Sequence, residues 1–170
     1  MYNLVEAVEP IIKSAGTLIM SYYHKGSLAL EQKPNDEGLV TQADMQGQKY
    51  LIDNLQRVMP QAGIIAEESD IRSSEHEYCW VIDPIDGTTN FVHGVPYFCI
   101  SVALTYQSKP IFGATYQPVL NEFFYAQDGY GAFLNGVKIQ VSEPEKASKG
   151  NLLIAVPYLD SAYKLSLIHI

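Results

Sequence analysis

Apolar residues recur every three to four positions in the first part of the chain. This repeat runs from Leu4 to Tyr22 and predicts a helix over about residues 3–24. Pro10 interrupts the helical pattern and is a point where the helix can kink. The polar stretch that follows, SLALEQKPNDEG, predicts a loop that allows short strand pairing.

A second helical repeat begins after this loop. Thr41 and Asp44 stand at its head, Pro60 stops it, and the spacing predicts a helix over about residues 42–58. The apolar face expected for this helix consists of Met45, Leu51, Ile52, Leu55, Val58 and Met59.

Further along, the pattern changes from helical to strand-like. Apolar runs alternate with turn signals such as QSKP, PVLN, DGYG and NG. The runs are AGIIAEE, YCWVID, YFCISVALTYQ, PIFGATYQP, EFFYAQ, GAFLN, VKIQV and NLLIAV. Two helices followed by a meander of strands predict an α+β fold, in which the helices pack on a largely antiparallel sheet.

The charge balance restricts the classes of partner. The 170 residues carry a net charge of −8, which disfavours nucleic acid and anionic membranes because both require a basic surface. Hydrophobic residues make up 47% of the chain, enough for a core, yet no apolar run approaches the ~20 residues of a membrane span. The first ten residues lack the basic start of a signal peptide, so we expect a cytoplasmic protein.

The two cysteines, Cys79 and Cys99, lie inside strand-like apolar runs. We expect both to be buried thiols, and no Cys/His spacing indicates a zinc site.

Two of the strand-like runs end in carboxylates. One ends at Glu67 and Glu68, and the other continues into Asp83 and Asp86. Several carboxylates at one sheet edge repel each other and are costly to bury unless a cation lies among them. Oxygen ligands of this kind are those that Mg²⁺ prefers.

The residues after Asp86 suit a phosphate group. Gly87 allows the backbone to approach a ligand closely, and Thr88, Thr89 and Asn90 can open a short helix whose free N–H groups bind anions. Taken alone, DPIDG also fits an ordinary turn, and Glu67–Glu68 also fits a solvated loop. The combination favours metal-assisted hydrolysis of a phosphate ester.

At this point the sequence resembles a family. The segment WVIDPIDGTTNF, the upstream AEES, LVTQAD at 39–44 and GAFLNG closely resemble the inositol monophosphatase family, whose members are magnesium-dependent, lithium-sensitive phosphatases. The resemblance runs from the first helix to about Tyr158. It implies the N-terminal αβ part of a layered αβαβα fold, with the C-terminal αβα half missing.

The resemblance also implies a metal site. Glu67, Asp83 and the backbone carbonyl of Ile85 would bind a first magnesium ion, and Asp83 and Asp86 would share further metal. In two-metal catalysis one ion activates water while the other stabilises the leaving oxygen.

The catalytic and phosphate-binding roles follow in the same way. The resemblance implies that Thr88 and Glu67 hold the attacking water, that Asp44 orients Thr88, and that Gly87 and Thr88 offer backbone N–H groups to the phosphate. Further candidates are Glu68, which flanks the site, and Lys33, in the loop between the two helices.

The expected substrate is a small phosphorylated polyol. Thr89-Asn90-Phe91 resembles enzymes that act on inositol monophosphate, but histidinol phosphate, bisphosphate nucleotides and fructose 1,6-bisphosphate remain alternatives. A non-catalytic phosphate-binding or regulatory protein is the alternative from another class. For the full-length protein the resemblance implies a homodimer.

The resemblance ends before the family's second half. That half carries a Trp-Asp-x-Ala motif, whereas the one tryptophan of this chain is Trp80. We therefore expect a metal- and phosphate-binding domain over 1–150, the start of a truncated half over 151–164, and little activity for this chain alone. The last residues, LSLIHI, match the translation of a transposon end, so 165–170 are expected to be a non-native tail; a natural apolar strand is the alternative.

Overall fold

The computed structural model describes residues 4–23, 30–32, 39–68, 76–141, 154–155 and 166–167. The chain divides into two compact units, Met1–Ile139 and Gln140–Ile170. In the second unit, β10 (Ile154–Ala155) pairs with β11 (Ser166–Leu167) in an antiparallel arrangement. All other elements belong to the first unit.

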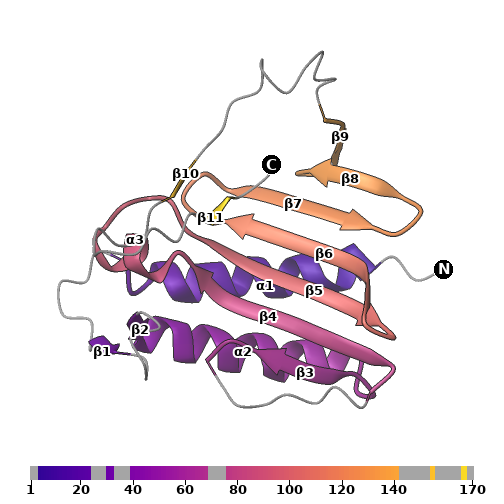
Figure 1. Cartoon of the computed structure of the whole chain (residues 1–170), viewed down its shortest axis with the longest axis horizontal. Helices are drawn as coiled ribbons and strands as arrows, with labels where there is room; N and C mark the ends of the chain where they lie inside the picture. The colour runs from indigo at the N-terminus through magenta and orange to yellow at the C-terminus, as the bar shows by residue number, and fades with distance from the viewer. Residues whose placement is uncertain are drawn as a thin grey trace. The chain divides into compact units, whose positions relative to one another are not determined.

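A seven-stranded sheet forms the centre of the first unit (Figure 1). Its strands, in spatial order, are β3 (Gly63–Ala66), β4 (Tyr78–Asp86), β5 (Cys99–Tyr106), β6 (Lys109–Gln117), β7 (Glu122–Gln127), β8 (Gly131–Leu134) and β9 (Val137–Ile139). The β3–β4 pair is parallel and the other pairs are antiparallel. The predicted α+β fold with a largely antiparallel sheet is confirmed.

Helix α1 (Leu4–Met20) is shorter than the predicted 3–24. It continues through Pro10 but ends in tight turns, because the amides of Ser21, Tyr22 and Tyr23 bond to carbonyls three residues back. The described part of the chain then stops at Tyr23, so the rest of the predicted helix lies outside it.

Helix α2 (Gln42–Val58) agrees with its prediction at both ends. One member of its expected apolar face is wrong, since Met45 is 49% exposed. The buried stripe instead runs through Ala43, Gly47, Leu51 and Leu55, and a residue two positions from both Ala43 and Gly47 points to the other side of the helix.

Three small elements complete the unit. Strands β1 (Leu30–Gln32) and β2 (Leu39–Thr41) pair antiparallel, which confirms the short pairing expected between the helices. Helix α3 (Thr88–Val92) is the short helix expected at Thr-Thr-Asn.

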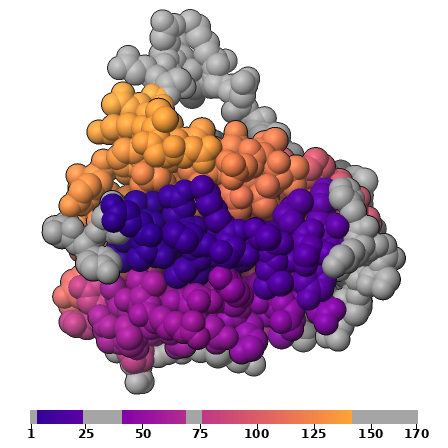
Figure 2. Space-filling model, turned by 180° about the vertical axis from the view of Figure 1, so that it is seen from behind, coloured from indigo at the N-terminus to yellow at the C-terminus, as the bar shows by residue number. Residues whose placement is uncertain are grey.

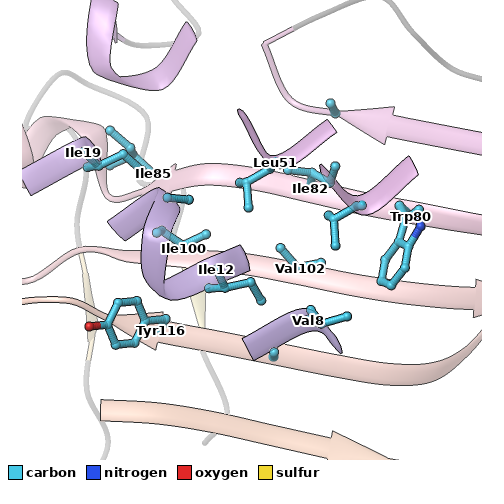
Figure 3. Close-up of a cluster of buried hydrophobic side chains, with 14 of the residues drawn as sticks. Val8, Ile12, Ile19, Leu51, Trp80, Ile82, Ile85, Ile100, Val102 and Tyr116 are labelled. Carbon is cyan, nitrogen blue, oxygen red and sulfur yellow. The ribbon is translucent and has the colours of Figure 1, made fainter. Parts of the chain in front are cut away.

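Helices α1 and α2 lie side by side on one face of the sheet, and Figure 2 shows them covering it from behind. The core lies between these two layers. Its fully buried large side chains include Ile12 and Leu51 from the helices and Trp80, Ile82 and Ile100 from the strands (Figure 3). None of the helices in the described residues is long and apolar enough to cross a membrane.

Candidate active site

A bulge near the end of β4 sets the direction of Asp83 and Asp86. Residues three apart in a regular strand point to opposite faces. Here the register shifts between them, so that Asp83 pairs with Ser101 and Asp86 pairs with Cys99. Because Ser101 and Cys99 are two residues apart and share a face, the two aspartates share it as well. The bulge thus brings both carboxylates to one side of the sheet.

Glu67 reaches the same place from the neighbouring strand. In the parallel β3–β4 pair, Ala66 lies opposite Ile82, and the amide of Glu67 donates to the carbonyl of Ile82 at 3.1 Å. The next residues along are therefore Glu67 and Asp83, and their carboxyl groups are in hydrogen-bonding contact.

The pKa of Asp83 reflects this crowding. Burial, the contact with Glu67, and the charges of Glu67 and Asp86 together raise the pKa of Asp83 to about 8. The amide of Ile85, which donates to Asp83 Oδ1 at 3.1 Å, opposes the rise only in part. None of the described groups that shift the pKa of Asp83 carries a positive charge.

The donor set fits a hard cation chemically but is incomplete. The candidates are all oxygens, as Mg²⁺ requires, and a cation beside them would relieve the repulsion at Asp83. Within the described residues, however, no three Asp, Glu, His or Cys side chains converge in a cluster that could hold a metal ion. The structure brings Glu67 and Asp83 into contact and leaves Asp86 exposed beside them.

Asp44 is a fully buried carboxylate at the head of α2. Its Oδ2 accepts the backbone amide of Thr41 at 2.8 Å and the Thr41 hydroxyl at 2.5 Å, while the Thr41 hydroxyl accepts the amides of Ala43 and Asp44. This reciprocal capping box fixes the side chain at the start of the helix. Burial raises the pKa of Asp44, although the hydrogen bonds from Thr41 and Thr88 lower it.

Thr88 connects this carboxylate to the β4 bulge. Its hydroxyl lies 3.1 Å from Asp44 Oδ1 and 3.0 Å from the carbonyl oxygen of Ile85, and it can donate to either. Since a hydroxyl has one proton to donate, its oxygen keeps lone pairs that can accept a hydrogen bond from water. The structure therefore joins three of the predicted residues, Asp44, Ile85 and Thr88, in one network.

Gly87 precedes α3 in a conformation that favours glycine. Its φ is +94°, in the left-handed region, and a Cβ there would lie 3.0 Å from the carbonyl oxygen of Tyr97. The residue bends the chain sharply from the end of β4 into α3. The first backbone N–H groups of a helix have no acceptor within it, and this holds for the start of α3 that follows Gly87.

A cluster of three aromatic rings includes Phe91 of α3. Phe91 of α3 packs edge-on against Phe98, with ring centroids 5.0 Å apart, and Tyr23 at the end of α1 contacts both rings. The Tyr23 hydroxyl donates to the carbonyl of Gly94 at 2.8 Å. Tyr23 thus connects the end of α1 to α3 and to the loop that follows it.

Lys33, Glu68 and the two cysteines remain of the residues that the sequence singled out. Lys33 lies outside the described residues. Glu68 is half-buried, and its backbone amide donates to Gln48 Oε1 at 2.9 Å. Of the cysteines, Cys79 is buried as expected, but Cys99 is only half-buried, because it shares the outward face with Asp86, whose Oδ2 lies 3.9 Å from its Sγ.

Sequence reasoning missed Gln48 and Tyr23. A signal for Gln48 was present, because it is a polar residue four positions after Asp44 on the buried stripe of α2. Tyr23 carried no such signal, since its partners Phe91 and Gly94 are far away in the sequence.

Comparison with known proteins shows a close similarity to one family. The model of the inositol monophosphatase family matches residues 2–163. An inositol monophosphatase of Dictyostelium discoideum is 39% identical over 157 residues, which cover 91% of this chain and 57% of that protein. The chain spans about half the length of the curated relatives it matches.

Two solved structures show the same arrangement of elements. A Thermotoga maritima IMPase matches with a TM-score of 0.76 and 36% identity, over 84% of this chain and 55% of that one. An IMPase/NADP phosphatase complexed with NADP and Ca²⁺ matches with a TM-score of 0.72 and 29% identity, over 81% of this chain and 52% of that one. The two helices and the sheet correspond to the N-terminal αβ part of the layered fold of these enzymes, and the chain belongs to the inositol monophosphatase family.

Proposed function

We propose that the whole protein hydrolyses a phosphate monoester in a magnesium-dependent reaction. The observation that carries this proposal is the Asp44–Thr88–Ile85 network, which ends beside the carboxylates of Glu67 and Asp83. A hydroxyl held in this way serves the orientation of water, which a protein that only binds phosphate does not need. Family membership supports the same reaction class.

In this proposal Glu67, Asp83, Asp86 and the carbonyl of Ile85 hold Mg²⁺. When bound there, Mg²⁺ would supply positive charge that lowers the pKa of water and offsets charge on the leaving oxygen. The raised pKa of Asp83 supports the assignment, because a cation bound there would offset the negative charge of Glu67 and Asp86 around it.

The remaining residues orient the reactants. Thr88 Oγ accepts a hydrogen bond from the attacking water while its own proton is directed toward Asp44 Oδ1, 3.1 Å away. Glu67, which follows the neighbouring strand β3, also binds this water. The backbone N–H groups of Gly87 and Thr88 bind the phosphate oxygens at the left-handed turn that leads into α3.

For the substrate we propose inositol monophosphate. The similar proteins include inositol monophosphatases, and one similar structure is an IMPase/NADP phosphatase with NADP bound. A nucleotide phosphate is therefore the alternative that a specific finding favours. We further propose a cytoplasmic, lithium-sensitive homodimer for the whole protein, in line with the family resemblance.

Release of inorganic phosphate from inositol 1-phosphate tests the proposal. With the 170-residue chain we expect low release that requires Mg²⁺ and disappears in Thr88→Ala. Thr89→Ala is the matched control, because Thr89 is the exposed neighbour in α3. NADP and fructose 1,6-bisphosphate, assayed in parallel, rank the substrates.

The non-catalytic alternative predicts a different outcome. Calorimetric titration would then show binding of Mg²⁺ and phosphate, but no release that depends on Thr88. Turnover close to that of the Thermotoga maritima relative would instead contradict the expectation that a chain of about half its length is weakly active.

A further inference from the structure

Gln48 is one of the few buried polar residues among those described. Its side chain is 4% exposed, and its Oε1 accepts the backbone amide of Glu68 at 2.9 Å, across 20 positions of sequence. A buried amide side chain is costly unless it is hydrogen-bonded. The hydrogen bond satisfies the buried Gln48 oxygen and ties the turn that follows β3 to helix α2.

The Gln48 side chain reaches this turn from helix α2. Gln48 lies four positions after Asp44, so both side chains leave the same face of the helix, one turn apart. Gly47 lies between them, and a Cβ there would be 2.9 Å from Ile19 Cδ1 and 3.5 Å from Pro84 Cβ. The absence of a side chain at Gly47 lets α2 approach Ile19 of α1 closely, while Pro84 lies at an ordinary contact distance.

Two successive amides of the turn are thus held by different elements. The amide of Glu67 donates to Ile82 on β4 at 3.1 Å, and the amide of Glu68 donates to Gln48 on α2 at 2.9 Å. Between these two bonds the Glu67 side chain is directed against Asp83.

We propose that Gln48 is a positioning residue that fixes the Glu67–Glu68 turn and so keeps the Glu67 carboxylate beside Asp83. Helix α2 then sets both sides of the site, through Asp44 to Thr88 and through Gln48 to Glu67. The effect on metal binding rests on the function proposed above, whereas the fixing of the turn does not.

Amide hydrogen exchange of the 170-residue chain tests the contact directly. Gln48→Met keeps the length of the side chain but removes the acceptor, and exchange at Glu68 is expected to accelerate about fivefold or more. Gln48→Glu keeps an acceptor oxygen and is expected to restore slow exchange. Gln46→Met, at an exposed position of the same helix, is expected to change nothing. The exchange rate of the Glu68 amide is divided by that of the amide of buried Leu55, so that a general loss of stability does not affect the comparison.

Binding of Mn²⁺, followed by its paramagnetic effect on water relaxation, tests the consequence. Gln48→Met is expected to weaken Mn²⁺ binding about tenfold, as other losses of outer-shell partners do, while Gln46→Met keeps the wild-type affinity. Unchanged exchange at Glu68 would overturn the proposal, and so would faster exchange with unchanged Mn²⁺ affinity. If the wild-type chain binds no Mn²⁺, the proposed function fails at its metal site, and the exchange of Glu68 alone decides whether Gln48 fixes the turn.

Discussion

The side chains of Asp44 and Thr88 are joined by a hydrogen bond of 3.1 Å although 44 positions separate them in the sequence. Asp44 belongs to the capping box of α2, and Thr88 is the first residue of α3. One carboxylate therefore stabilises the start of a long helix and orients a hydroxyl at the candidate site.

Asp44→Asn is expected to destabilise the fold. The amide group would place N–H donors at one of the two oxygen positions, where Asp44 now accepts either from Thr41 or from Thr88, which disrupts the cap or the bond to Thr88. We expect the free energy of unfolding to fall by about 2 kcal/mol. Urea denaturation measures it, with the buried Trp80 as the one tryptophan whose fluorescence reports unfolding.

Asp53→Asn is the matched control on the same helix. The Asp53 side chain is exposed and forms an ion pair with Lys49 at 3.1 Å, so its loss is expected to cost at most about 0.5 kcal/mol. Equal effects of the two substitutions would show that the Asp44 network contributes nothing beyond a surface charge.

Local patterns accounted for much of this architecture. The α2 boundaries followed from Thr41, Asp44 and Pro60, because caps and breakers act within a few residues. Most strands of the meander followed from turn signals between apolar runs. Even the approach of Glu67 to Asp83 was expected, since the carboxyl ends of adjacent strands meet at one edge.

Tertiary contacts decided the rest. The bulge that turns Asp83 and Asp86 to one face depends on the pairing with Cys99 and Ser101, which no local pattern reveals. The exposure of Met45 depends on which side of α2 faces the sheet. The bond from Tyr23 to Gly94 depends on where α1 ends.

Gly87→Ala is expected to destabilise the chain more than an ordinary glycine substitution. The left-handed φ of +94° strains any other residue, and the added Cβ would lie 3.0 Å from the carbonyl oxygen of Tyr97. We expect a loss of about 2–4 kcal/mol in the free energy of unfolding, measured by thermal melting.

Two other glycines separate these effects. Gly129 has a φ of +77° but open space around its Cβ position, so Gly129→Ala is expected to cost about 1 kcal/mol. Gly113 has neither a left-handed φ nor a close neighbour, so Gly113→Ala is expected to be nearly neutral. If Gly87→Ala costs no more than Gly129→Ala, the close approach of Tyr97 is not a constraint.

Tyr23→Phe removes the hydrogen bond from the Tyr23 hydroxyl to the carbonyl of Gly94, which follows α3. The ring and its contacts with Phe91 and Phe98 remain, so we expect a loss of about 1 kcal/mol. Exchange of the α3 amides is expected to accelerate, because the bond to Gly94 restrains the loop that follows this helix. Thermal melting and amide exchange measure the two effects.

Two further variants serve for comparison: Tyr23→Leu is more severe, and Tyr97→Phe is a control. The leucine variant also loses both ring contacts and is expected to cost about 1–3 kcal/mol more. Tyr97 is 65% exposed, and its phenylalanine variant is expected to behave as the wild type. Exchange of α3 that is the same in all three variants would exclude a role for Tyr23 in holding this helix.

The stability of the metal-free chain is expected to fall as pH rises. In the folded protein the pKa of Asp83 is raised to about 8 by burial, by the Glu67 contact and by the charges of Glu67 and Asp86, and its ordinary value is 3.8. Between these values the folded state binds a proton that the unfolded state has released. The stability that comes from the protonated Asp83 is therefore fully present below the unfolded pKa and is lost as pH rises through the folded pKa.

Urea midpoints measured with a chelator at about pH 5 and about pH 8 check this expectation. Asp83→Asn is expected to flatten the dependence, whereas Asp128→Asn, at an exposed turn, is expected to keep the wild-type slope. Added Mg²⁺ is expected to raise the midpoint more at the higher pH, where a larger fraction of Asp83 is ionised and binds a cation without first releasing a proton. A slope that persists in Asp83→Asn would assign the pH dependence to other groups and remove the support that the raised pKa gives to a cation site.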